Sequence, residues 1–494
     1  MIEHQSEGNF LDQFEQSLIN HIELIAVDEE ESKKTYFELY QTMRCIGSWI
    51  QSQKKATSIL IYSKKSFLSI AAIFSCFLEN IPYLVCNKND PENRINYIIK
   101  NNKIDLVLHD EEDFSLNESS GIELINIRSI PISTLINFEF SKKIKRPALT
   151  FYTSGSTGKP KAVSISIQNI ENFVTWSSSF FDIKKQDRIA SVAPLYFDLS
   201  IFDLFSTLFS GGCICIVPEK IKKFPAAFTQ WLDDQHINVL YMVPTAFINL
   251  VRHGAWDQRQ RTDLKTLLFA GEPYPLHDLN QLRSLHTKAK IFNLYGPTET
   301  NVCAYYQIPK QKELKLLQEL PLGHSISKAN LYLLDEDDQI ITELNQPGVL
   351  FCTGKCVALG YLKQGSIEHH KNFFDHPLLG KGYKTGDLAK QSEKGFVFLG
   401  RTDRQIKKNG YRIDPHEIES YIRKHPDVQE AAVAFHDQQL IAYISTLKTI
   451  HPSYIINILM KNLPTHSMPD DYVFVSEFKK TASGKIDYLN LGKQ

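Results

Sequence analysis

The chain has 494 residues, 43% of them hydrophobic and 22% charged, so it is long enough for a large core and for two or more folding units. Its 55 basic and 56 acidic residues nearly cancel, which gives no electrostatic basis for binding nucleic acid or an anionic membrane. No apolar run approaches the roughly 20 residues that span a bilayer, and the N-terminus MIEHQSEGNF does not resemble a signal peptide. The eight scattered cysteines fit a reducing compartment and lack zinc-binding spacing. We therefore expect a cytoplasmic protein that binds neither membranes nor nucleic acid.

Short apolar runs alternate with amphipathic stretches in the first part of the chain. Strands are expected at 58–63, 82–86 and 104–109, with helices at 67–79 and 91–101 between them. A similar alternation of strand-like and helix-like segments occurs at 213–218, 228–235, 239–243 and 267–270. Strand–helix–strand alternation predicts parallel sheets with helices on both faces. Such sheets bind ligands at the carboxyl ends of their strands.

The sequence pattern changes near Pro347. From there on, short strand-like runs such as GVLFCTG and GFVFLGR are separated by glycine turns. This pattern predicts a small β-rich subdomain. The last stretch, after Arg401, reads as a compact α+β unit. The predicted fold class is α/β: a large domain (1–402) of parallel or mixed sheets with flanking helices and a β-rich subdomain, and a small mobile α+β domain (403–494), with the boundary at Asp403.

A segment rich in glycine and hydroxyl groups, FYTSGSTGKPKAV, occupies residues 151–163. Glycines let backbone N–H groups approach phosphate oxygens, while hydroxyls and lysines add donors and charge. The order of glycines and lysines differs from that of the GxxxxGK[ST] loop, and a flexible connector is the alternative interpretation. The candidate phosphate-binding residues are Thr153, Ser154, Gly155, Ser156, Thr157, Gly158, Lys159 and Lys161.

Two further segments offer nucleotide-binding groups, NLYGPTET (293–300) and YKTGDL (383–388). Asn293 can read the edge of adenine, and Tyr295 offers a face for stacking. Thr298 and Glu299 offer oxygens for Mg²⁺ and phosphates, although a Gly-Pro turn with a capping threonine is the alternative. Asp387 can accept both ribose hydroxyls.

A glycine-flanked lysine, Lys485, follows in TASGKID near the end of the chain. A nucleotide loop in one domain and a lone lysine in the other predict a site that forms when the two domains close. That arrangement suits an enzyme that activates a carboxylate with ATP.

These segments, in this order and spacing, closely resemble the adenylate-forming superfamily, which includes acyl-CoA synthetases, luciferases and the adenylation domains of nonribosomal peptide synthetases. The resemblance covers nearly the whole chain and extends to GKCVALGYL (354–362), GRTDRQIKKNGYRIDPHEIE (400–419) and LPTHSMPDDYVFV (463–475). It implies ATP and Mg²⁺ as cofactors, with Glu299 as a metal ligand. It also implies further nucleotide contacts at Gly271, Glu272, Gly296, Phe398 and Arg401.

By the same resemblance, Lys485, Thr298 and Glu299 are catalytic. Lys485 would bridge the substrate carboxylate and the α-phosphate while a carboxylate oxygen attacks phosphorus and pyrophosphate leaves. The small domain would then rotate about Asp403 and present another face for attack by a thiol. A rigid turn at Asp403 is the alternative.

The segment YFDLSIFD carries Asp198, which in amino-acid-activating members of the superfamily pairs with the α-ammonium of the substrate. A buried carboxylate requires a cationic partner; the alternative is an aspartate that caps a helix. Alignment outward from the motifs adds the other pocket residues, which are Leu199, Phe202, Tyr241, Leu268, Ala270, Leu294, Val302 and Cys303.

This pocket looks very like that of free-standing L-proline adenylating enzymes, which load a carrier protein in natural-product biosynthesis. It implies L-proline as the substrate, with valine or alanine as alternatives. The chain ends at Gln494, shortly after Lys485, so we expect the phosphopantetheine thiol to come from a separate carrier protein. The rival functions are acyl-CoA formation, ligation to a protein, and a non-catalytic binding module.

Overall fold

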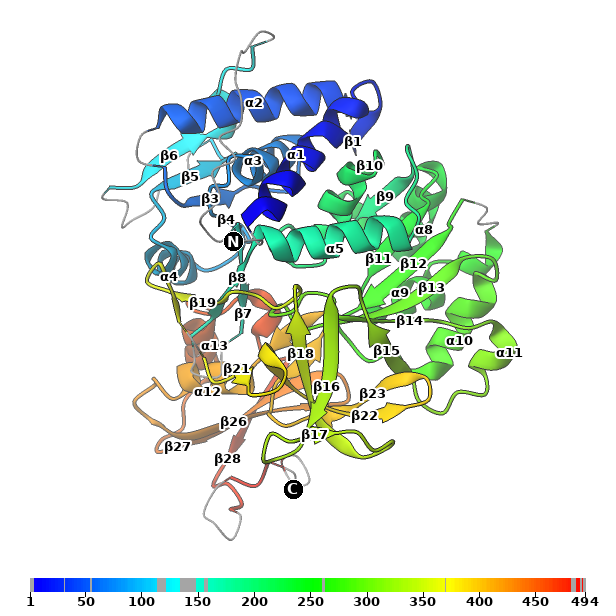
Figure 1. The fold of residues 1–494 in the computed structure, drawn as a ribbon. Coiled ribbons are helices and arrows are strands. Elements are labelled where there is room, and N and C mark those ends of the chain that lie inside the picture. Colours follow the sequence, from blue (N-terminus) through cyan, green and yellow to red (C-terminus); the bar gives the residue numbers. More distant parts are fainter. Residues whose placement is uncertain are drawn as a thin grey trace.

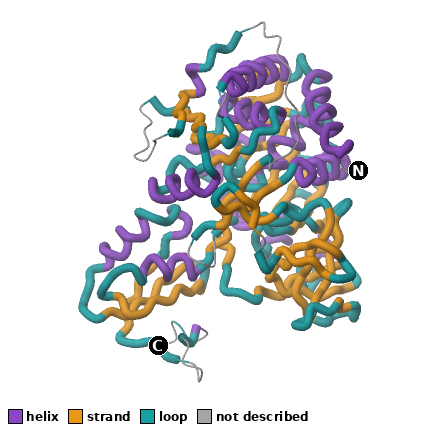
Figure 2. The backbone as a smooth tube through the Cα atoms, turned by 60° about the vertical axis from the view of Figure 1, so that its left-hand side comes forward, coloured by secondary structure: helices purple, strands orange, loops and turns teal. Residues whose placement is uncertain are grey.

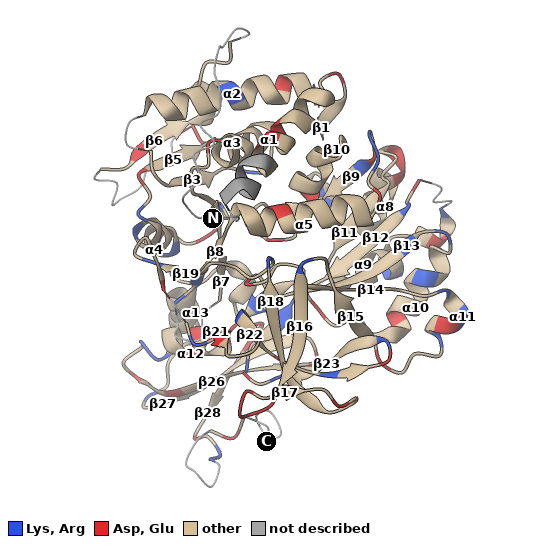
Figure 3. Cartoon of the chain, viewed as in Figure 1, with Lys and Arg blue, Asp and Glu red and all other residues tan. Residues whose placement is uncertain are grey.

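The structure is a computed structural model that describes residues 4–30, 32–53, 56–112, 121–133, 148–154, 159–259, 263–368, 370–480, 486–488 and 491. Figure 1 shows a large body of two sheets with helices and, below it, a smaller unit formed by the end of the chain. Acidic and basic residues are interspersed over both parts (Figure 3). Among the described helices, none combines the length and apolar character needed to cross a membrane.

The first sheet has eight strands in the order β20-β19-β8-β7-β4-β3-β5-β6, and β3 runs parallel to both β4 and β5. The alternation expected between residues 58 and 109 is confirmed as β3-α3-β4-α4-β5. Its strands are β3 (Ile59–Tyr62), β4 (Tyr83–Val85), β5 (Leu106–His109), β6 (Glu123–Asn126), β7 (Leu149–Thr153), β8 (Lys161–Ile165), β19 (Gly360–Lys363) and β20 (Ser366–Glu368). The helices of this half are α1 (His4–Asn20), α2 (Tyr36–Ser52), α3 (Phe67–Leu78), α4 (Glu92–Asn102) and α5 (Ile167–Phe180).

The second sheet is mixed: β9 to β13 form a parallel centre, and antiparallel strands continue it into the β-rich region. Its strands are β1 (Ile25–Glu29), β2 (Ser32–Thr35), β9 (Arg188–Ser191), β10 (Cys213–Ile216), β11 (Val239–Met242), β12 (Thr266–Ala270), β13 (Lys290–Tyr295), β14 (Ala304–Gln307), β15 (Pro321–Ser325), β16 (Ala329–Leu334), β17 (Ile340–Ile341), β18 (Pro347–Gly354), β21 (Phe373–His376), β22 (Gly380–Ser392) and β23 (Gly395–Arg401). The helices are α6 (Thr207–Phe209), α7 (Glu219–Lys222), α8 (Pro225–Asp234), α9 (Pro244–His253), α10 (Leu276–Leu285) and α11 (Gln311–Leu314). The β-rich region begins before Pro347, because β15 already pairs with β23 and β16 with β18.

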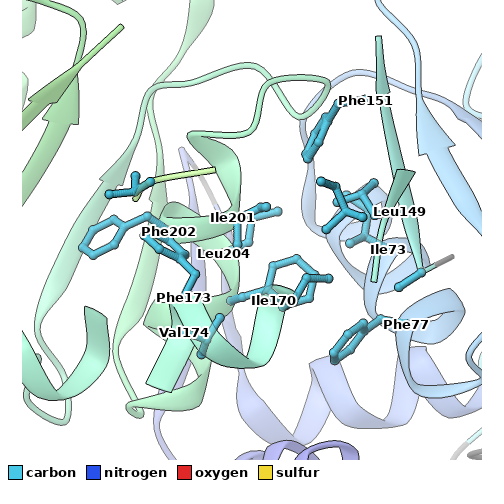
Figure 4. Packing of buried hydrophobic residues seen from close by; sticks show 14 of the residues in the cluster. Ile73, Phe77, Leu149, Phe151, Ile170, Phe173, Val174, Ile201, Phe202 and Leu204 are labelled. Carbon is cyan, nitrogen blue, oxygen red and sulfur yellow. The ribbon is translucent and has the colours of Figure 1, made fainter. Parts of the chain in front are cut away.

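The main core fills the space between these two sheets. Helix α3 is apolar on all sides, which is typical of a fully buried helix. Side chains from α3, β7, α5 and the helical segment at residues 201–204 meet there (Figure 4). Close packing of both sheets against these helices therefore holds the ends of the core strands in place. It holds the segment that follows β9 in the same way.

The small unit contains a hairpin of β24 (Ile406–Lys408) and β25 (Tyr411–Ile413) and a sheet of β26 (Val428–His436), β27 (Gln439–Thr446) and β28 (Asp471–Val475). Helices α12 (Pro415–Ile422) and α13 (Pro452–Met460) pack on one face of this sheet. Phe478 and Ile486 pack on the other face. Figure 2 shows the strands and helices of this unit beside the large domain. The predicted boundary at Asp403 falls between the end of β23 and the start of β24, and it stays a prediction.

Candidate functional site

A cavity lies where the carboxyl ends of the parallel strands of the large domain face the hairpin of the small domain. The large domain contributes Thr153, Ser154, Tyr196, Phe197, Asp198, Leu199, Tyr241, Ala270, Gly271, Gly296, Thr298, Val302, Asp387 and Arg401. The small domain contributes Lys407, Gly410, Tyr411, Arg412, Glu417 and His466. Many of the residues predicted from the sequence therefore share one space between the domains.

Asp198 lines this cavity together with Leu199 and Tyr241, and its carboxyl lies close enough to Thr298, Glu299 and Lys407 to be affected by them. Burial raises the pKa of its carboxyl, and a hydrogen bond with Thr298 opposes that change. The backbone N–H of Leu199, the next residue in the chain, also hydrogen-bonds to the carboxylate and lowers its pKa. A carboxylate has several acceptor sites, so these bonds leave part of its acceptor capacity unused.

The other predicted pocket residues divide into two layers. Leu199, Tyr241, Ala270 and Val302 line the cavity. Phe202 lies behind Tyr241, with ring centroids 5.6 Å apart in an edge-to-face contact. The remaining members of the set are Leu268, which is fully buried, Leu294, which lines a second pocket, and Cys303, whose thiol contacts that of Cys352.

The second pocket opens beside Gly271 and Lys407, which line both cavities. Its walls include Glu272, Tyr274, Asn293, Tyr295, Leu322 and Phe398. The Asn293 side-chain N–H donates to the Pro321 carbonyl at 2.8 Å, so the amide oxygen remains as an acceptor. A pocket with apolar walls and an acceptor of this kind suits the edge of a purine that carries an amino group.

Asp387 lies next to this pocket and accepts hydrogen bonds from the Tyr295 hydroxyl and the Arg401 guanidinium. The side chain of Asp387 is 2% exposed. Arg401 also binds Asp403, at 2.6 Å. Asp387 and Arg401 thus form a fixed polar group, whereas the Tyr295 hydroxyl is already engaged.

Glu299 is fully buried among groups that stabilise its charge. Burial alone would raise the pKa of this carboxyl, but Arg412 at 3.0 Å and the Tyr361 hydroxyl at 2.6 Å hold it below the usual value. The Tyr383 hydroxyl lies 3.1 Å from that of Tyr361. Burial lowers the pKa of the Lys161 ammonium, and the charge of the nearby Glu299 carboxylate partly opposes this change.

Only part of the predicted phosphate loop is described, because Gly155, Ser156, Thr157 and Gly158 lie outside the described residues. The buried Thr153 hydroxyl has no hydrogen-bond partner, while the Ser154 hydroxyl donates to the Arg412 carbonyl at 2.8 Å. Lys159 lies with its Nζ 5.9 Å from the centroid of the Tyr97 ring.

The hairpin of the small domain closes the cavity through contacts with several residues of the large domain, including the one between Ser154 and Arg412. The Gly410 N–H donates to Glu272 at 2.6 Å, Arg412 binds Glu299, and the Tyr411 ring meets that of Phe197 at 4.8 Å. Gly410 has φ +79°, and a Cβ there would lie 2.5 Å from Val243 Cγ1, so glycine is required for this approach. The sequence did not reveal these roles of Gly410, Tyr411 and Arg412. The polar segment KKNG (407–410) was the signal that could have indicated a turn here.

The family profile described as "AMP-binding enzyme" matches residues 14–362, and that described as "AMP-binding enzyme C-terminal domain" matches residues 417–485. The chain belongs to the AMP-binding enzyme family. This confirms the resemblance inferred from the sequence, and with it ATP and Mg²⁺ as the cofactors of this adenylate-forming enzyme.

Several known AMP-binding enzymes are similar to the chain over nearly its whole length. An "L-proline--[L-prolyl-carrier protein] ligase" of Pseudomonas fluorescens is 28% identical, over 97% of each chain. A "D-alanine--D-alanyl carrier protein ligase" of Bacillus licheniformis is 28% identical, over 95% of this chain and 96% of the relative. The solved structure of an o-succinylbenzoate CoA synthetase of Bacillus subtilis has a TM-score of 0.85 and 20% identity, over 97% of this chain and 98% of that one; this similarity supports the fold.

The donor set of this AMP-binding enzyme fits Mg²⁺ under one condition. Mg²⁺ is commonly held by one or two carboxylates together with substrate phosphates; Glu299 offers one carboxylate, and the Thr153 hydroxyl, which has no partner, is a further oxygen donor that lines the cavity. In this structure Arg412 occupies that carboxylate. Glu299 could therefore hold the ion only after the hairpin withdraws.

Lys485 lies outside the described residues of this enzyme. Lys480 and Ile486, on either side of it, pair in an isolated antiparallel bridge. Ile486 packs with Phe478 on the face of the small sheet opposite to α12 and α13. It is α12 that reaches the large domain, where Glu417 lies 3.9 Å from Arg94. The small domain thus presents its hairpin and α12 to the cavity.

Proposed function

We propose that the protein activates L-proline with ATP as prolyl-AMP and then transfers the prolyl group to the phosphopantetheine thiol of a separate carrier protein. The observation that carries this proposal is the half-buried Asp198 carboxylate, which lines a cavity beside Leu199 and Tyr241 and whose pKa is raised by burial; Gly271 and Lys407 line both this cavity and the nucleotide pocket. Burying a carboxylate is unfavourable unless a cation pairs with it. The α-ammonium of an amino acid is such a cation.

The apolar residues around Asp198 favour a compact, uncharged side chain. Leu199, Ala270 and Val302 supply apolar surface, and Tyr241 is held in place from behind by Phe202. The secondary ammonium of proline has two N–H donors for the carboxylate, and its ring suits walls of this kind. Similarity to both L-proline and D-alanine ligases supports a small amino acid, and alanine and valine are the alternatives.

In the adenylation step, the substrate carboxylate attacks the α-phosphorus of ATP and pyrophosphate leaves. Asn293 and the slot around it hold adenine, Asp387 and Arg401 hold the ribose, and Thr153 to Lys161 bind the phosphates. Mg²⁺ at Glu299 would offset phosphate charge. Lys485 neutralises the charge that develops on the reacting groups, so catalysis depends on positioning and electrostatics.

In the transfer step, the thiol of the carrier attacks the carbonyl carbon of the adenylate and AMP leaves. The contacts of Gly410, Tyr411 and Arg412 with the large domain support a role for the present orientation in this step, because they close the site with the hairpin. Two similar enzymes are named for carrier proteins as acceptors, which supports a carrier as the partner. Asp403 is the proposed hinge.

The test is amino-acid-dependent ATP–pyrophosphate exchange with the twenty standard amino acids, D-proline and D-alanine. We expect strong exchange with L-proline. Strong exchange with alanine or valine instead would retain amino acid adenylation and overturn the choice of substrate. Activity only with carboxylic acids that lack an amine would overturn amino acid activation and favour acyl-CoA formation.

A further inference from the structure

Two buried tyrosine hydroxyls lie in a row behind the Glu299 carboxylate, and the proposed reaction gives them no role. The Tyr361 hydroxyl donates to Oε1 of Glu299 at 2.6 Å, and the Tyr383 hydroxyl lies 3.1 Å from that of Tyr361. A tyrosine hydroxyl has one proton to donate. Because Tyr361 donates its proton to the carboxylate, Tyr383 is the donor of the second hydrogen bond. The three groups thus form a directed chain that ends on Glu299, and hydrogen bonds in such a chain strengthen one another.

The two oxygens of the Glu299 carboxylate have different partners. Tyr361 is the close partner of Oε1, whereas the Arg412 guanidinium lies 3.0 Å from Oε2 and 3.3 Å from Oε1. Tyr361 is in strand β19 and Tyr383 in strand β22, both in the large domain, while Arg412 is in strand β25 of the small domain. If the small domain rotates as proposed, Oε2 loses its partner and Oε1 keeps its own.

Aromatic packing holds both tyrosine rings, so their hydroxyls have little freedom to turn away. Phe373 contacts the Tyr361 ring edge-to-face at 5.3 Å and the Tyr383 ring at 4.9 Å between centroids. His370 also packs edge-to-face on Tyr361 at 5.3 Å, and Lys161 Nζ lies 5.2 Å from the centroid of that ring. Burial raises the pKa of both hydroxyls, so they remain protonated donors at neutral pH.

The backbone of Glu299 is held by the same stretch of chain. The Ala358 N–H donates to the Glu299 carbonyl at 2.8 Å, and Tyr361 follows three residues later. Strand β19 pairs with β8, where Tyr361 lies opposite Val163. A segment built into the first sheet therefore fixes residue 299 at its carbonyl and at one carboxylate oxygen. The other carboxylate oxygen, Oε2, is left for a partner that can change.

We propose that Tyr361 and Tyr383 hold Oε1 of Glu299 as a fixed anchor, so that Oε2 can exchange the Arg412 guanidinium for Mg²⁺. Both tyrosines are positioning residues, because they act on the metal through Glu299. Groups that hydrogen-bond to a ligating carboxylate fix its orientation, and their loss commonly lowers metal affinity or activity ~10–100-fold. The inference rests on the proposed binding of Mg²⁺ by Glu299 and is independent of the choice of amino acid.

The test measures how much Mg²⁺ strengthens the binding of α,β-methylene-ATP, an analogue that cannot release pyrophosphate. Isothermal titration calorimetry gives the Kd of this analogue with and without Mg²⁺, in the absence of turnover. Tyr361→Phe and Tyr383→Phe each remove one hydroxyl and retain the ring. Tyr36→Phe is the matched control, because the hydroxyl of this fully buried tyrosine donates to the Gly212 carbonyl at 2.7 Å, just before β10.

We expect the Mg²⁺-dependent gain in affinity to fall about tenfold or more in Tyr361→Phe, with the Kd measured without Mg²⁺ unchanged within about twofold. Tyr383→Phe should show a smaller loss of the same kind, and the control should leave both Kd values unchanged. A full gain in Tyr361→Phe, or an equal loss of affinity with and without Mg²⁺, would overturn the inference. If Tyr361→Phe does not fold, Tyr383→Phe decides by the same two criteria.

Glu299→Gln separates failure of this inference from failure of the proposed metal site. This variant should lose the Mg²⁺-dependent gain altogether. If it retains the gain, Glu299 is not the metal ligand, and the inference is wrong together with that assignment. If it loses the gain while both tyrosine variants keep it, Glu299 binds Mg²⁺ without the tyrosines, and the inference alone is wrong. Amino-acid-dependent pyrophosphate exchange tests the proposed function separately.

Discussion

In the proposed function a single residue, Asp198, links partial burial to the choice of substrate. Its carboxyl has a pKa above that of an ordinary aspartate, chiefly because it is buried. The carboxylate has to be ionised in order to pair with the α-ammonium of an amino acid. As the pH falls through this raised pKa, the carboxyl becomes protonated and loses its attraction for the ammonium.

We therefore expect kcat/KM for the amino acid to fall on the acidic side at a higher pH than an exposed aspartate would give. In Asp198→Asn this acidic limb should disappear, and kcat/KM should be low at every pH. Asp198→Ala should lose about 3–5 kcal/mol of amino acid binding, as is typical when a buried ion pair is broken. Exchange kinetics between pH 5 and 9 check this, with the exposed Asp182→Asn as the control. An acidic limb that persists in Asp198→Asn contradicts the assignment.

The sequence allowed some site residues to be predicted and concealed others. Asp198, Asn293, Glu299 and Asp387 stand in short distinctive segments, so their chemistry could be read locally. The groups that surround Glu299 could not, because Tyr361 lies 62 residues away and Arg412 lies 113 residues away along the chain. Their convergence depends on how the domains pack, which no local pattern records.

The same limit applies to the pocket walls. Alignment placed Phe202 and Cys303 beside the substrate, whereas both side chains are fully buried behind the cavity surface. A position in sequence predicts which strand or turn a residue belongs to. Whether its side chain reaches the cavity depends on what packs in front of it.

At the level of elements, the strands and helices between residues 58 and 109 were predictable because hydrophobic runs and amphipathic stretches alternate there. The start of the β-rich region could not be predicted from the sequence. Strand β15 precedes Pro347 and joins this region by pairing with β23, more than seventy residues later in the chain. Pairing between distant strands leaves little trace in composition.

The hairpin β24–β25 is the element that connects the small domain to the catalytic centre. Arg412 neutralises the buried Glu299 carboxylate in the present orientation of the small domain. Arg412→Met would leave this carboxylate buried without its cation, which destabilises the present orientation relative to one in which Glu299 binds Mg²⁺. We expect transfer to the carrier thiol to slow about tenfold or more, with pyrophosphate exchange unchanged within twofold.

Single-turnover transfer from preformed aminoacyl-AMP measures the rate of transfer to the carrier thiol. Equilibrium ATP–pyrophosphate exchange measures the rate of adenylation. Lys408→Met is the matched control, because Lys408 is in the same hairpin but pairs with Asp470 inside the small domain. It should leave both rates unchanged. Equal slowing of both reactions by Arg412→Met would show that the arginine serves general stability.

For the whole molecule, the proposed mechanism has the two steps use different faces of the small domain. The present arrangement brings Gly410 against Val243 and Glu272, while Ile486, the residue after Lys485, packs on the opposite side of the small sheet from α12. One rigid arrangement cannot easily bring both the hairpin and this far side to the same cavity. Rotation near Asp403, between β23 and β24, would exchange them.

Two variants should therefore separate the half-reactions. Lys485→Ala should abolish pyrophosphate exchange while the large domain stays folded, and it should still transfer a supplied aminoacyl-AMP to the carrier. Gly410→Val should keep exchange and lose transfer, because a side chain at φ +79° would overlap Val243. Exchange assays and single-turnover transfer on the same preparations distinguish these outcomes, and circular dichroism monitors folding. If each variant lost both activities to the same extent while remaining folded, the two steps would share one arrangement of the domains, and Asp403 would have no role as a hinge.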